Sequence, residues 1–114
     1  MKKGLNLLSG PGNDLVSSTD LTAAGAHIIL FTTGRGTPFG APVPTVKIST
    51  NSALYEKKSN WIDFNVGTVA QGESLDDAGE RLLDFVLAVA SGEKTKSEAR
   101  GAREIAIWKD GVTL

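Results

Sequence analysis

The order of segments along the chain predicts an α/β fold, in which a mostly parallel sheet of about four strands forms a Rossmann-like three-layer sandwich. Short apolar runs alternate with longer segments of helical periodicity, as in successive βαβ units. The most apolar run, residues 27–32, is rich in Ile and Phe, which is typical of a central strand covered on both faces. A length of 114 residues suits one hydrophobic core, so residues 1–114 are predicted to form a single α/β domain.

The predicted strands are short and separated by turn-forming residues. In chain order they are residues 4–8, 27–32, 45–50 and 61–65. Val46 and Ile48 alternate with polar neighbours in the third strand, with the period of two that a strand requires. The segment between the second and third strands, residues 33–44, contains three glycines and three prolines and is therefore predicted to be an irregular loop.

The predicted helices are marked by residues that favour helix ends. In chain order they are residues 14–25, 52–58, 75–91 and 95–101, followed by an extended tail at 104–108. Asn13 or Asp14 can cap the first helix and Asn51 the second. Ser74 precedes the clearest helix, which carries one apolar face. Thr95, followed three residues later by a glutamate, predicts a capping box.

Composition excludes several classes of function. Twelve Lys and Arg oppose thirteen Asp and Glu, so the formal charge is -1 and no dense basic run is present for nucleic acid or a membrane surface. No apolar stretch is long enough for a membrane span, which predicts a cytoplasmic protein. The absence of cysteine excludes thiol catalysis and thiolate metal sites within this chain. We therefore expect a small-molecule ligand.

The loop that follows the most apolar strand is the first candidate site, because ligands of parallel α/β sheets gather at the carboxyl ends of the strands. Its candidate residues are Thr32, Thr33, Gly34, Arg35 and Gly36. The glycines permit close approach of the backbone, and the guanidinium can grip a carboxylate by two charge-assisted hydrogen bonds. A surface loop with a solvated arginine is an equally open interpretation. No Walker motif or dinucleotide fingerprint is present.

Polar residues near the other strand ends form a second candidate set. Asp63 and Asn65 stand on alternate positions and can bind a polyol, although they can equally brace the turn. Asn51 is a third candidate, and capping a helix is its more common role. No metal-binding cluster and no catalytic base can be assigned from the sequence, so a complete active site within this chain is not expected.

An ordered set of motifs resembles the C-terminal region of the altronate and galactarate dehydratase family. The matching segments are residues 4–7, 11–12, 32–40, 42–51, 62–65 with Gly67, and 88–93 with Thr95 and Ser97. They cover essentially the whole chain. The sequence of residues 61–65 is more similar to that of altronate dehydratases than to that of galactarate dehydratases.

The resemblance implies a C-terminal domain of a longer bacterial sugar-acid dehydratase, preceded by a small β-rich domain and a central domain. The implied reaction converts D-altronate to 2-keto-3-deoxy-D-gluconate and water in hexuronate breakdown. It implies a divalent metal, commonly Fe²⁺, bound mainly outside this chain. Galactarate dehydratase, a related sulfo-lyase and a non-catalytic sugar-acid-binding or scaffold module remain alternatives, and a homo-oligomer stays open.

Overall fold

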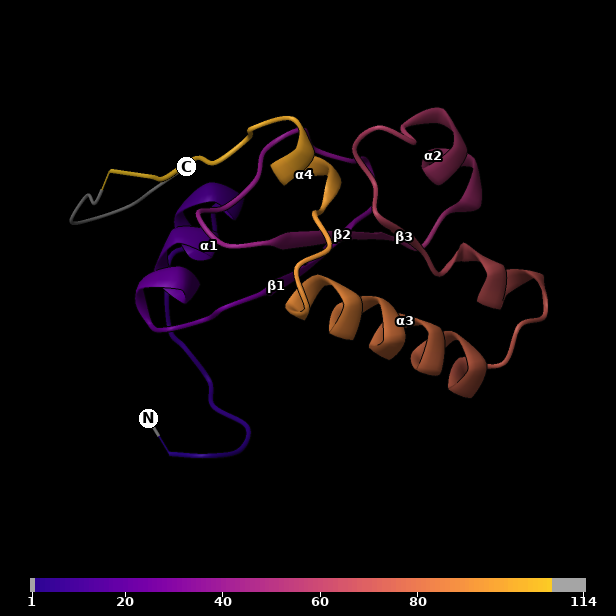
Figure 1. The fold of residues 1–114 in the computed structure, drawn as a ribbon, viewed down its shortest axis with the longest axis horizontal. Coiled ribbons are helices and arrows are strands. Elements are labelled where there is room, and N and C mark those ends of the chain that lie inside the picture. The colour runs from indigo at the N-terminus through magenta and orange to yellow at the C-terminus, as the bar shows by residue number, and fades with distance from the viewer. Residues whose placement is uncertain (1, 108–114) are drawn as a thin grey trace.

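The computed structural model describes residues 2–107, which form a mixed α/β fold with a small parallel sheet (Figure 1). Within that range the elements are, in order, α1 (Asp14–Ala23), β1 (Ile29–Thr33), β2 (Thr45–Ser49), α2 (Ser52–Lys57), β3 (Phe64–Asn65), the 3-10 helix η1 (Gly67–Gln71), α3 (Leu75–Ala90) and α4 (Lys96–Ala99). The described helices lack the combination of length and apolar composition that crossing a membrane requires.

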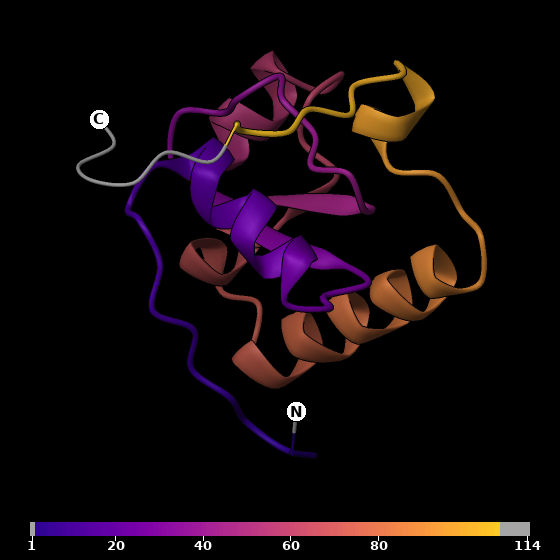
Figure 2. The same cartoon turned by 90° about the vertical axis from the view of Figure 1, so that its left-hand side faces the viewer.

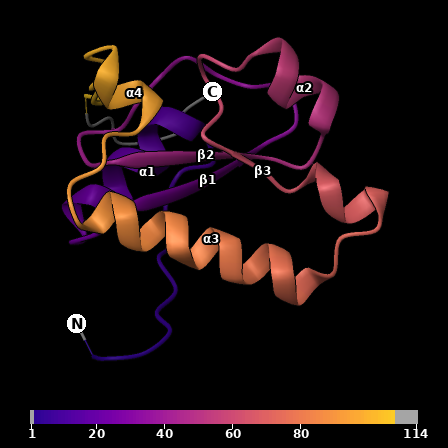
Figure 3. The ribbon, with the colours of Figure 1, turned by 45° about the vertical axis from the view of Figure 1, so that its right-hand side comes forward.

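The sheet has the strand order β1-β2-β3, and both pairs of neighbours are parallel. The long helix α3 lies along one face of it, while α2 and α4 lie beyond the other face (Figures 1 and 3). All five residues of the central strand β2 are buried. The predicted mixed α/β class and parallel sheet are therefore confirmed.

The hydrophobic core joins the sheet to α3. Val46, Ile48 and Phe64 from the strands pack with Val89 of α3, and Phe85 adds its ring to Phe64 at a centroid distance of 5.9 Å. Each such apolar side chain contributes roughly 1.5–3 kcal/mol when fully buried. This packing fixes the strands and thereby the loops that follow them.

The helix ends follow the predicted caps. Asn51 Oδ1 accepts from the amide of Leu54, and Ser74 accepts from Asp77. Thr95 forms the complete capping box. The four predicted helices are confirmed, with ends that differ by a few residues from the predicted ones.

The connection from β1 to β2 is irregular, as its glycines and prolines predicted. It leaves the carboxyl end of β1 and runs back over the face of the sheet toward the start of β2 (Figure 1). Phe39 and Ala41 of this loop are buried, and the Phe39 ring meets Phe31 edge to face at a centroid distance of 5.3 Å. This loop therefore occupies the layer where a crossover helix would lie in a Rossmann-like sheet.

The predicted strand at residues 4–8 is wrong, so the sheet has three strands and the Rossmann-like sandwich is not confirmed. Leu5 and Leu7 are 95% and 94% exposed. An apolar segment becomes a strand only where a neighbouring strand pairs with its backbone, and this segment has no such neighbour among the described residues.

Two further differences concern the second half of the chain. The predicted strand at 61–65 is reduced to β3, because the amides of Trp61 and Ile62 both donate to the carbonyl of Lys58 and close a turn there. The tail at 104–107 has no regular secondary structure, and Trp108 lies outside the described residues. This tail passes α1, where the Ala106 amide donates to Thr19 Oγ1 at 3.0 Å (Figure 2).

Candidate functional site

The candidate loop begins with a tight turn at the end of β1. The amide of Gly36 donates to Thr33 Oγ1 at 2.9 Å. Gly36 has a φ of +76°, a left-handed conformation that a residue with a Cβ rarely adopts. A Cβ at this position would also lie 3.0 Å from Cδ of Lys58. Thr33 and Gly36 therefore have defined structural roles in shaping the loop.

The side chain of Arg35 is exposed at this turn. Its guanidinium makes no hydrogen bond or ion pair with any residue in the range 2–107. Thr32 and Gly34 beside it are also exposed, and the space next to Gly34 is open. The structure thus brings the predicted loop residues together and leaves the arginine accessible to an anion.

Three cationic side chains hold the carbonyl groups of the same loop. Nζ of Lys58 donates to the carbonyl of Arg35 at 2.7 Å. Nζ of Lys47 donates to the carbonyl of Thr37 at 2.7 Å, and Arg100 donates to the carbonyl of Pro38 at 2.8 Å. None of the three donors forms an ion pair within the described part of the chain. Three positive charges therefore lie beside the neutral backbone carbonyls of this loop.

Lys47 is the most unusual of these cations, because it is fully buried in the middle of β2. Its ammonium lies 5.6 Å from the ring centroid of Phe39, under the loop. Burial, and then repulsion from Arg100, lowers its pKa to about 8 from the ordinary value of 10.5. Asp63 and Glu104 oppose this shift. The charged form is thus held in an environment that penalises it.

Asp63 is buried, and the main chain occupies both of its carboxylate oxygens. Oδ2 accepts from the amide of Lys47 at 2.8 Å, and Oδ1 accepts from the amide of Lys96 at 2.8 Å. The carboxylate therefore joins β2 to the first residue of α4. This geometry favours the bracing interpretation of Asp63 over the ligand interpretation.

The two candidate amide side chains also contact the protein. Asn51 caps α2 and is exposed. Asn65 accepts from the amide of Gly67 at 2.8 Å and donates to Ser52 Oγ at 3.0 Å, so it links β3 to the start of α2. Both side chains lie at the carboxyl ends of β2 and β3, as predicted, and both hold backbone there.

A second polar cluster at the end of β3 was not predicted. Arg81 of α3 binds both carboxylate oxygens of Glu73, at 2.7 and 2.8 Å, and Thr68 donates to the same carboxylate. Hydrogen bonds from Arg81 and then Thr68 lower the pKa of Glu73 to about 2. The guanidinium also lies 4.9 Å from the ring centroid of Phe64. This cluster fastens η1 to α3.

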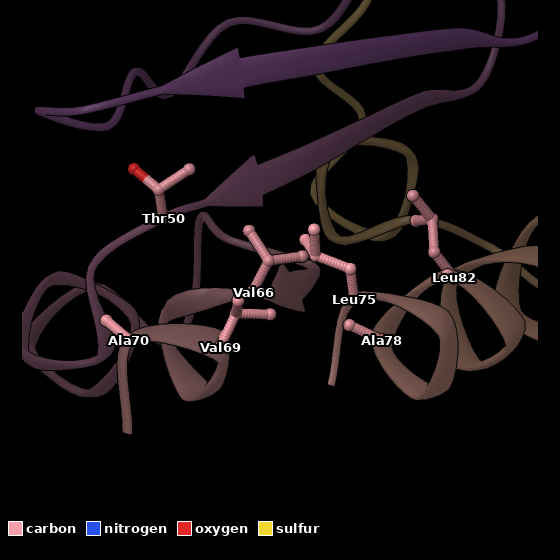
Figure 4. A pocket seen from close by; sticks show the side chains of 8 residues that line it. Thr50, Val66, Val69, Ala70, Leu75, Ala78 and Leu82 are labelled. Atoms are coloured by element: carbon pink, nitrogen blue, oxygen red, sulfur yellow. The ribbon is translucent and has the colours of Figure 1, made fainter. Parts of the chain in front are cut away.

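A hollow of about 510 Å³ lies between η1 and α3 (Figure 4). Its lining is apolar except for the hydroxyl of Thr50. The lining residues are Thr50, Val66, Val69, Ala70, Leu75, Ala78, Gly79 and Leu82. It offers no charged group for a carboxylate. Residues 2–107 contain no group of three His, Cys, Asp or Glu side chains that could hold a metal ion. The donors described in this chain therefore do not fit a metal site of their own.

Sequence reasoning missed Lys47, Lys58 and Arg100. Lys47 falls on the polar phase of the alternation in β2, which predicts exposure for a sheet with one solvated face. The signal that could have found it is the central position of β2, because a central parallel strand is covered on both faces. Lys58 and Arg100 reach the loop across 23 and 62 residues of sequence, and no local pattern indicates such contacts.

The chain matches a protein-family model and is similar to several known proteins. Residues 1–113 match the family model described as D-galactarate/altronate dehydratase, C-terminal. The chain is 51% identical over 111 residues to altronate dehydratase of Escherichia coli, covering 97% of the chain and 22% of that protein. It is 53% identical over 113 residues to altronate dehydratase of Bacillus subtilis, covering 98% and 23%.

A more distant relative is galactarate dehydratase (L-threo-forming) of Escherichia coli, which is 41% identical over 95 residues, covering 82% of the chain and 18% of that protein. The chain thus spans less than a quarter of the length of each of these relatives, at 22%, 23% and 18%. The family match extends over nearly all of the sequence. The chain therefore belongs to the family of D-galactarate/altronate dehydratase C-terminal domains.

Proposed function

We propose that this chain supplies the carboxylate-binding loop of an altronate dehydratase, a hydro-lyase that converts D-altronate to 2-keto-3-deoxy-D-gluconate and water. The observation that carries the proposal is the exposed Arg35 at a loop whose carbonyls are held by three cations. Altronate is favoured over galactarate because the two altronate dehydratases are 51% and 53% identical to the chain, against 41% for the galactarate enzyme.

The chemistry of the reaction explains why such a loop is useful. Removal of the proton at C2 and loss of the hydroxyl at C3 give an enol, which tautomerises to the 2-keto-3-deoxy acid. Negative charge grows on the carboxylate as the proton leaves. A guanidinium that binds the carboxylate through two parallel hydrogen bonds stabilises that charge as well as orienting the substrate. We assign Arg35 to this role, with the exposed Thr32 hydroxyl meeting a substrate hydroxyl.

The proposal places the remaining parts of the active site outside this chain. Preceding domains would supply the base, the acid for the leaving hydroxyl, and a divalent metal, Fe²⁺, whose chemistry is to stabilise the enediolate. The protein is proposed to work in the cytoplasm in hexuronate breakdown.

The proposal is tested with the complete natural polypeptide, supplied anaerobically with ferrous iron and offered D-altronate and D-galactarate separately. We expect 2-keto-3-deoxy product from altronate. Arg35→Ala should raise KM roughly 10- to 100-fold, because a charge-assisted hydrogen bond contributes about 1.5–3 kcal/mol net. Arg103→Ala is the matched control, since its side chain is 66% exposed and lies apart from the loop's carbonyl contacts.

If only galactarate is turned over, galactarate rather than altronate is the substrate, and the proposed dehydration chemistry stands. No turnover of either acid would favour a related lyase, such as a sulfo-lyase, or a non-catalytic sugar-acid-binding module. If a folded Arg35→Ala variant keeps the wild-type KM and kcat, the carboxylate role of the loop is refuted.

A further inference from the structure

Three carbonyls of the candidate loop, those of residues 35, 37 and 38, are held by side chains from three parts of the fold. Lys47 comes from β2, while Lys58 and Arg100 are the C-cap residues that follow α2 and α4. Lys47 is buried, Lys58 is half-buried and Arg100 is exposed. Because all three donors are cations, the contacts that shape the loop also hold positive charge beside it.

Lys58 makes the contact closest to the candidate ligand-binding side chain. Its Nζ donates a hydrogen bond to the backbone carbonyl oxygen of Arg35 itself, at 2.7 Å. Its ammonium also lies 4.7 Å from the ring centroid of Trp61, so the aromatic face restricts where it can move. The stem of Lys58 lies against Gly36, where a Cβ would approach it to 3.0 Å.

These contacts hold the backbone of Arg35 and Gly36 in one conformation. They thereby fix the position of the Arg35 Cα and the direction of its Cα–Cβ bond, from which the side chain extends. A loop that is already held in place loses less conformational entropy when its arginine binds a carboxylate than a mobile loop does. The gain appears in ligand affinity and leaves the chemical step unchanged.

We propose that Lys58 is a positioning residue for Arg35, which holds the arginine's carbonyl so that the backbone carrying the guanidinium is already in place for the substrate carboxylate. This inference rests on the proposed function of the loop. It assigns Lys58 to substrate affinity without direct contact with the substrate.

The test is a double-mutant cycle in the complete polypeptide, with D-altronate as the probe. Lys58→Met keeps the apolar stem and removes the ammonium. We expect it to raise KM about tenfold, with kcat within about twofold, because one charge-assisted hydrogen bond is lost. In the Arg35→Ala background, Lys58→Met should have no further effect, since residues that act through each other are not additive. Lys58→Arg should restore most of the affinity.

Lys57→Met is the matched control, because Lys57 is the exposed last residue of α2 and its loss changes net charge by the same amount. An unchanged KM in Lys58→Met, an equal effect in the Arg35→Ala background, or the same effect from Lys57→Met would each overturn the positioning role. An unchanged KM in Arg35→Ala refutes the proposed function itself. The thermal unfolding midpoint of each variant separates misfolding from loss of affinity.

Discussion

The buried ammonium of Lys47 should make the stability of the domain rise with pH. Its pKa is about 8 in the fold and 10.5 ordinarily, so between these values the unfolded chain binds more protons than the native state. Stability increases with pH wherever the unfolded state binds more protons. The gain in unfolding free energy is therefore absent below pH 8, where Lys47 is charged in both the folded and the unfolded state. It is complete above pH 10.5, where Lys47 is neutral in both.

The size of the effect follows from the shift. The difference between 10.5 and about 8 corresponds to about 3 kcal/mol of unfolding free energy at 1.36 kcal/mol for each pKa unit. Lys47→Met should remove this rise, because methionine has similar length and no titrating group. At neutral pH its net effect is smaller, since relief of the buried charge offsets the unpaired carbonyl of Thr37.

Urea unfolding of residues 1–114 measures the prediction. The unfolding free energy is compared between pH values below 8 and above 10.5 for the wild type, Lys47→Met and Lys57→Met. Lys57 is exposed on α2, so its variant should keep the pH-dependent rise of the wild type. If Lys47→Met retains the same rise, Lys47 does not titrate at a lowered pKa and the argument from burial is refuted.

Two other substitutions probe the contacts around the site. Gly40→Ala should destabilise the domain by about 1–3 kcal/mol in urea unfolding, because overpacking forces the backbone to move. Its Cβ would lie only 2.5 Å from the carbonyl oxygen of Ala102. The pKa of Glu73 is lowered mainly by its hydrogen bonds with Arg81, so the wild type should lose unfolding free energy as the pH falls from 4.5 toward 2. Glu73→Gln should be less stable than the wild type above pH 4.5 and should show less of this acid-dependent loss. Acid unfolding measures it, and the exposed Glu80→Gln on α3 should match the wild type.

The helices were predictable because their signals are local. A capping side chain and the amide it binds lie within three residues of each other, as for Ser74 and Asp77 or Thr95 and Glu98. The irregular loop was equally predictable, because proline and glycine act on their own backbone. The parallel pairing followed from the alternation of strands and helices.

The strand at residues 4–8 could not be decided in the same way. Its apolar composition is that of a strand, but strand formation depends on a neighbour that the sequence does not specify. The 3-10 helix η1 was also missed, since it has no side-chain cap and the Glu73 carboxylate that fastens its surroundings to Arg81 reaches across eight residues. Contacts of this kind are set by tertiary packing.

The candidate site illustrates how polar residues divide their roles at the ends of strands. The sequence placed Asp63, Asn65 and Arg35 at this edge of the sheet as equivalent candidates. In the structure Asp63 accepts from two main-chain amides and joins β2 to α4. Asn65 accepts from the Gly67 amide and donates to the Ser52 hydroxyl, which joins β3 to α2. Both are short side chains whose oxygens match nearby amides, so bracing satisfies them inside the fold.

Arg35 differs because its guanidinium binds no acceptor within residues 2–107 and is exposed. The carbonyls of residues 35, 37 and 38 accept hydrogen bonds from Lys58, Lys47 and Arg100 instead. Each of these contacts also adds a positive charge near the arginine, which favours an anion over any neutral ligand. The donors that stabilise the loop thus also make the surroundings of its arginine positive. This coupling between loop stability and anion binding is why the Lys58 and Arg35 variants should be non-additive in affinity.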